Sequence, residues 1–124
     1  MKVPENGVLL RIFIGESDRE PGRNRPLFEA IVRRAREAHL AGATVLRGPM
    51  GFGRHSRMRA AKLLELSTDL PIVIEIVDAE EKIELLLPHL DSMVTEGMVT
   101  MEYVMILIYR HGEESASPTQ PAEP

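Results

Sequence analysis

The pattern that most constrains the fold is an order of strand, helix, glycine and strand that occurs twice along the chain. Residues 8–14 and 71–77 are dense in apolar and β-branched side chains, as is typical of strands. Segments with helical periodicity follow over residues 27–39 and 79–96. Two β-α-β units in one chain predict an α+β, ferredoxin-like fold (βαβ-βαβ), with an antiparallel four-stranded sheet and both helices on one face.

The two further strands are expected over residues 43–48 and 98–109, which gives the spatial strand order fourth, first, third, second. Gly42 is predicted to provide the left-handed residue that ends the first helix. Asp78 is predicted to cap the second helix, and Pro88 to kink that helix or to begin another short one. Residues 60–67 fit a short helix and a strand equally well.

A glycine-rich, basic stretch follows the second strand. Gly48, Gly51 and Gly53 break regular structure, and Arg47, Arg54 and His55 surround the break. Exposed N–H groups beside guanidinium groups favour an anion, above all a phosphate. The cations of this stretch are Arg47, Arg54, Arg57, Arg59 and Lys62. A solvated hairpin loop would have the same composition, and Glu16 with Asp18 form a weaker alternative site for a cation.

The strand patterns also predict an unusual sheet surface. Each strand has one apolar face and one face that mixes apolar residues with a single charge. In the expected strand order these charges are Glu102, Arg11, Glu75 and Arg47, with alternating signs. An apolar face with an ion-pair ladder favours a homo-oligomer that buries this face, although an exposed sheet with ordinary surface Val and Ile is the alternative.

Composition bounds the remaining classes of function. The chain has no cysteine, and its four histidines show no metal-ligand spacing, so neither a metal nor a cofactor is expected. It contains no P-loop, nucleophile elbow or GxGxxG element, so no catalytic residue is predicted. Few aromatic residues and a near-neutral body argue against nucleic-acid binding.

The length predicts one domain, over residues 1–111, and a disordered acidic tail over residues 112–124. The N-terminus lacks an apolar signal region, and no apolar run reaches membrane-spanning length. A cytoplasmic protein without membrane insertion is therefore expected.

Several separated blocks together resemble a known family. These blocks are GVLLRIFIGESDR, IVRRAREAHLAGATVLRG, GFG, LSTDLPIVIEIVDAEEKI and EGMVTMEYV, within about residues 7–109. They are similar to the PII-like family known as domain of unknown function 190, which is related to PII nitrogen-regulatory proteins. The resemblance implies a trimer with inward-facing sheets, a T-loop-like segment at about residues 49–69, and a nucleotide in the cleft between subunits.

The resemblance also implies ligand contacts around the base of that loop. The candidate ligand-binding residues are Arg47, Gly48, Gly51, Phe52, Gly53, Arg54, His55 and Arg57. Two departures argue against the ATP and 2-oxoglutarate sensing of PII proteins. Residues 49–69 contain no tyrosine, and residues 78–82 are acidic where PII proteins have a loop rich in glycine and lysine.

Three hypotheses follow. The first is a trimeric PII-like regulator that binds a small anionic effector, for which an adenine nucleotide is a candidate, and docks through its loop on a membrane transporter or an enzyme. The second is an oligomeric scaffold, or an accessory protein of a transporter, without a ligand. The third, least favoured, is a small enzyme that uses His55.

Overall fold

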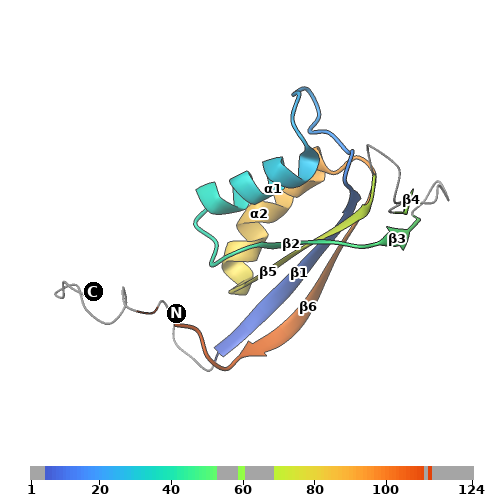
Figure 1. Ribbon diagram of the computed structural model, residues 1–124. Coiled ribbons are helices and arrows are strands. Elements are labelled where there is room, and N and C mark those ends of the chain that lie inside the picture. The colour runs from blue at the N-terminus through green and yellow to red at the C-terminus, as the bar shows by residue number, and fades with distance from the viewer. Residues whose placement is uncertain (1–4, 53–58, 61–68, 111, 113–124) are drawn as a thin grey trace.

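The computed structural model describes residues 5–52, 59–60, 69–110 and 112. Four antiparallel strands form the main sheet in the order β2-β5-β1-β6 (Figure 1). These strands are β1 (Glu5–Gly15), β2 (Thr44–Arg47), β5 (Pro71–Asp78) and β6 (Met98–Ile106). The ferredoxin-like class and the predicted strand order are confirmed. Two short strands, β3 (Met50–Gly51) and β4 (Arg59–Ala60), pair separately beside the sheet.

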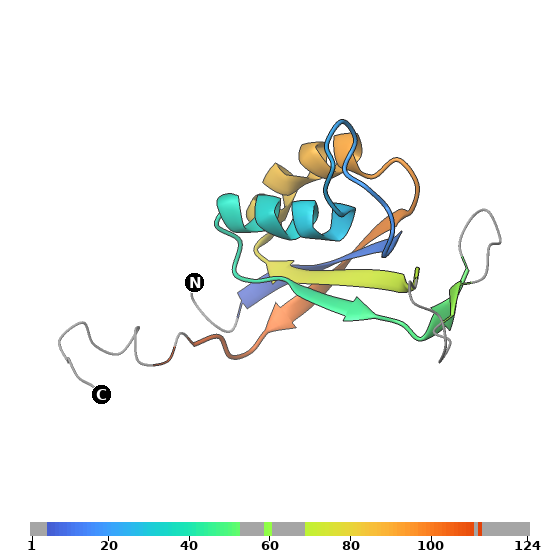
Figure 2. The ribbon, with the colours of Figure 1, turned by 45° about the horizontal axis from the view of Figure 1, so that its top comes forward.

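Both helices, α1 (Leu27–Glu37) and α2 (Glu80–Met93), lie on one face of the sheet (Figure 2). Alternate residues of the central strands point to this layer, because successive side chains of a strand lie on opposite faces. The buried core consists mainly of Val8, Leu10 and Ile12 from β1, Ile72, Ile74 and Ile76 from β5, and Ile31, Ile83 and Leu86 from the helices. Fully burying each large apolar side chain contributes about 1.5–3 kcal/mol.

The end of α1 differs from the prediction. The left-handed residue is His39, with φ of 62°, and not Gly42. The amide of His39 donates to the carbonyl of Arg36, and the amide of Leu40 donates to the carbonyl of Ala35. These two bonds form a Schellman motif, which ends the helix before Gly42 is reached. Histidine adopts the left-handed region more readily than most non-glycine residues, so no glycine is needed there.

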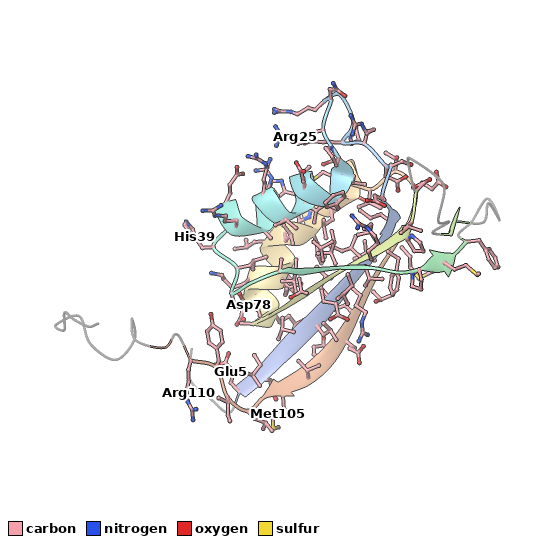
Figure 3. All side chains as sticks on the ribbon, viewed as in Figure 1. Glu5, Arg25, His39, Asp78, Met105 and Arg110 are labelled. Carbon is pink, nitrogen blue, oxygen red and sulfur yellow. The ribbon has the colours of Figure 1, made fainter. Side chains whose placement is uncertain are left out.

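The role predicted for Asp78 was also wrong in detail. The N-cap residue of α2 is Ala79, which makes no side-chain cap bond. Asp78 is only 4% exposed, and its carboxylate accepts from the amides of Ala41 at 2.8 Å and Ala79 at 2.6 Å. His39 and Asp78 therefore lie at the same end of the molecule, where this carboxylate ties the chain after α1 to the start of α2 (Figure 3).

Helix α2 runs through Pro88, so no second helix begins there. Pro88 is exposed, so water can reach the backbone carbonyl that loses its helical partner. Of residues 60–67, only Ala60 is described, and it belongs to β4. The predicted tail lies outside the described residues except for Gly112. Among the described parts of the chain, neither helix is long and apolar enough to cross a membrane.

Candidate functional site

The sheet face opposite the helices carries an ion-pair cluster on an apolar surface. We call this surface, formed by alternate residues of the four strands, the bare face. Its strand positions include Leu9, Arg11 and Phe13 of β1, Val73, Glu75 and Val77 of β5, Thr44 and Leu46 of β2, and Met98, Thr100, Glu102, Val104 and Ile106 of β6. No helix covers this face in the described part of the chain (Figure 2). The mixed apolar and charged face was predicted for all four strands, and it is present in β1, β5 and β6.

Arg11 holds two carboxylates of the bare face. Its Nε donates to Glu75 at 2.9 Å, and its Nη1 donates to Glu102 at 2.8 Å. The hydrogen bond to Glu75, followed by the bond to Glu102, raises the pKa of the Arg11 guanidinium above its ordinary value. Arg11 therefore stays charged throughout the range in which carboxyl groups titrate.

Arg47 does not join this cluster, so the fourth position of the predicted ladder was wrong. Residues opposite one another in a ladder share a face, and the residue opposite Glu75 is Thr44, whereas Arg47 lies opposite the buried Ile72. The alternation of β2 is therefore shifted by one residue from the prediction, so that Thr44 and Leu46 share the face of Glu75 and Arg47 does not. All four of its residues are exposed, so no buried set fixes its register from the sequence.

Instead, Arg47 belongs to the base of the segment at about residues 49–69. Its Nη2 lies 2.7 Å from an Oε2 of Glu16, at the end of β1. The backbone of Glu16 donates to the carbonyl of Leu70 at 2.8 Å. The amide of Gly48 donates to the carbonyl of Pro71, also at 2.8 Å. Three segments distant in sequence therefore meet at this base, and the Arg47 side chain, 55% exposed, retains N–H groups for a further acceptor.

Close packing accounts for a glycine at position 51, whereas a Cβ at position 48 would make only an ordinary contact. A Cβ on Gly51 would lie 3.0 Å from the Cγ of Pro71, and one on Gly48 would lie 3.5 Å from it. Phe52 is exposed. The other predicted contacts, Gly53, Arg54, His55 and Arg57, lie outside the described residues, so their place in a site stays a prediction.

The alternative cation site is not formed as expected. Glu16 is engaged by Arg47, and an Oδ2 of Asp18 accepts from the amide of Gly15 at 2.9 Å. The described residues contain no group of three or more side chains suited to hold a metal ion.

A hollow of about 350 Å³ opens at the other end of β2, and the sequence did not predict it. It is lined by residues 41–44, Glu75 and Val77 of β5, and Ile106, Ile108 and Tyr109 at the end of the described chain. The signal was the run of small residues Ala41, Gly42 and Ala43, which leaves space beside the strands. A pocket between this run and a segment much later in the chain depends on tertiary contacts that periodicity does not report.

The fold defines a ferredoxin-like α+β protein whose solved structural neighbours include PII-like proteins. It is similar to the structure of CPII, a nitrogen regulatory PII-like protein from Thiomonas intermedia K12 bound to ADP, AMP and bicarbonate, with a TM-score of 0.60 and 20% identity over 82% of this chain and 89% of that chain. It is also similar to a putative PII-like signaling protein from Thermus thermophilus, with a TM-score of 0.56 and 15% identity over 82% and 90% of the two chains.

The chain belongs to the DUF190 family, described as "Uncharacterized ACR", whose profile matches residues 7–106. A UPF0166 protein of Aquifex aeolicus is 38% identical over 80% of this chain and 91% of its own length. A UPF0166 protein of Methanocaldococcus jannaschii is 31% identical over 69% of this chain and 77% of its own. The family predicted from the sequence blocks is confirmed.

Proposed function

We propose that this protein is a PII-like regulatory protein without catalysis of its own. In this proposal it assembles as a homo-oligomer, expected to be a trimer, through the bare face. It binds a small anionic effector of the adenine nucleotide class at a cleft between copies. The segment at about residues 49–69 then contacts a partner protein such as a transporter or an enzyme.

The observation that carries the proposal is the construction of the base of that segment. The end of β2 is tied to β5 through Gly48 and Pro71 and to the end of β1 through Arg47 and Glu16. A guanidinium that retains free N–H groups at a fixed backbone position suits a phosphate or carboxylate ligand. In this proposal, a ligand that alters the contacts of Arg47 also alters the start of the segment at about residues 49–69, as expected of a loop that responds to an effector.

The comparisons support the choice of ligand class. CPII shares this fold and was solved with ADP, AMP and bicarbonate, all of which are anions.

Calorimetric titration with ADP, AMP and bicarbonate tests the proposal. We expect one of these anions to bind wild type, and Arg47→Ala to weaken that binding about tenfold or more. Glu16→Gln removes the carboxylate that competes for Arg47, so it should tighten binding. Arg33→Ala on the exposed surface of α1 is the matched control and should change nothing.

Opposite effects of the Arg47 and Glu16 substitutions separate ligand binding from damage to the loop base, because both substitutions break the same ion pair. Recovery of the nucleotide unchanged after incubation is expected of a regulator. Binding of none of the three anions would favour the ligand-free scaffold, and conversion of the nucleotide would favour an enzyme.

A further inference from the structure

The charge on the bare face does not balance. Arg11 supplies one positive charge, and Glu75 and Glu102 supply two negative charges to the same guanidinium. The sequence pattern suggested that Arg47 would balance the ladder, but Arg47 lies on the other face of the sheet and pairs with Glu16. The cluster therefore has a net charge of −1 when both carboxyl groups are ionised.

In the strands that the structure describes, no neighbouring group on this face compensates for that charge. Among the described strand positions, the remaining ionisable residue of the face is Glu5, at the far end of β1 from Arg11. Strand β2 contributes Thr44 and Leu46, which do not titrate. Tyr109, which follows β6, shares the hollow with Glu75 and carries no cationic group. The helices, with His39 beyond α1 and His89 in α2, belong to the opposite layer.

In a single protomer the excess charge costs little, because water reaches it. The side chains of Arg11, Glu75 and Glu102 are 36%, 33% and 60% exposed. A second copy laid on the bare face removes that water. Burial disfavours a carboxylate that lacks a full partner, and a second carboxylate on the same guanidinium disfavours it further.

We propose that assembly through the bare face takes up protons at the Glu75–Glu102 pair, which makes the oligomer tighter as the pH falls. This proposal rests on the assembly in the proposed function and adds its regulation. Glu102 is the side chain that gains most from protonation, because it is the more exposed carboxylate before assembly and so loses the most hydration. A protonated Glu102 still accepts a hydrogen bond from Arg11 through its carbonyl oxygen.

The sign follows from linkage. The carboxyl group has a higher pKa in the assembled state than in the free protomer, so the assembled state binds more protons. The association constant should therefore rise as the pH is lowered from about 8 to about 5, by at most about tenfold per pH unit for each proton taken up. The dependence ends below the pKa of the free protomer, where both states are protonated.

Sedimentation equilibrium of the full chain over this pH range, at constant ionic strength, is the test. Glu102→Gln should assemble about tenfold more tightly than wild type near pH 8, with a flatter pH dependence. Glu75→Gln serves as a second variant with the same expected direction. Glu81→Gln, on the exposed surface of α2, changes the net charge equally and should behave as wild type.

A calorimetric dilution in two buffers of different ionisation enthalpy counts the protons directly, which a merely structural effect of Glu102→Gln would not alter. Release of protons on dissociation of wild type, reduced in Glu102→Gln, supports the proposal. An oligomer whose association is independent of pH, or a Glu102→Gln variant that matches Glu81→Gln, overturns it while leaving the assembly intact. A monomer in every variant at every pH overturns the assembly as well.

Discussion

The two faces of the sheet are built from the same strands, but they differ in how far their apolar side chains are buried and in how their charged groups are bonded. Toward the helices, Ile72, Ile74 and Ile76 are buried within one protomer, whereas on the bare face Phe13 and Val77 remain exposed. The buried charged residue on the helix side, Asp78, is bonded by backbone amides, whereas the charges of the bare face bond one another. The covered face is buried within a single copy, and the bare face is the surface through which we propose that copies assemble.

The largest expected effect comes from neighbouring residues of β5 that point to opposite faces. Ile74→Ala should lower the free energy of unfolding by about 2–5 kcal/mol, because it leaves a cavity in the core. Val73→Ala should change the stability of the dissociated protomer by less than about 1 kcal/mol and weaken association instead. Urea unfolding at low protein concentration, with sedimentation at higher concentration, measures both quantities. If Ile74→Ala and Val73→Ala lowered the stability of the protomer equally, the proposed difference between the two faces would be contradicted.

The second prediction concerns Gly97, the residue that precedes β6 where this strand begins to pair with β1. Gly97 has φ of 146°, and a Cβ there would lie 2.5 Å from the carbonyl oxygen of Phe13. Gly97→Ala should therefore destabilise by about 2 kcal/mol or more. Gly42→Ala is the matched control, because nothing lies within 4 Å of its Cβ position, and it should change stability by less than about 0.5 kcal/mol. Thermal unfolding of both variants checks this, and similar melting temperatures would contradict it.

The third prediction tests the buried carboxylate of the covered face. Asp78→Asn keeps one acceptor oxygen but turns an amide N–H₂ toward a backbone donor, so it should cost about 1–3 kcal/mol of unfolding free energy. Asp91→Asn, exposed on α2, is the control and should be nearly neutral. Denaturant unfolding gives the difference. An Asp78→Asn variant with unchanged unfolding free energy would show that this carboxylate does not stabilise the link between the chain after α1 and the start of α2.

The smallest effect lies at the edge of the sheet. The hydroxyl of Tyr103 donates to Glu80 at 3.2 Å, and this bond raises the pKa of the exposed phenol above its ordinary value. The small stability that it contributes is present below the phenol's unfolded pKa and is lost as the pH rises through the higher folded pKa. Absorbance titration in a Tyr109→Phe background, with and without Glu80→Gln, measures the shift. The Glu80→Gln variant should titrate at lower pH, and an unchanged titration would contradict the assignment.

The sequence predicted the parts in which one face of an element is clearly apolar. Alternation in β1 and β5 assigned Arg11 and Glu75 to one face, and the apolar density of the two β-α-β units led to the strand order. It did not fix the phase of β2, whose short, exposed strand has no buried set, and so Arg47 was placed on the wrong face. Ion pairs such as Arg47–Glu16 join segments by tertiary geometry that local patterns do not contain.

The molar mass of the protein in solution tests most directly whether the bare face is buried between copies. Sedimentation equilibrium at micromolar concentration should give a multiple of the 13.9 kDa protomer, three if the assembly is the expected trimer. In the same measurement, Val73→Asp on the bare face should lower that mass by placing a further charge in the interface. A wild-type mass of 13.9 kDa at every concentration would contradict the account, because the bare face would then face water.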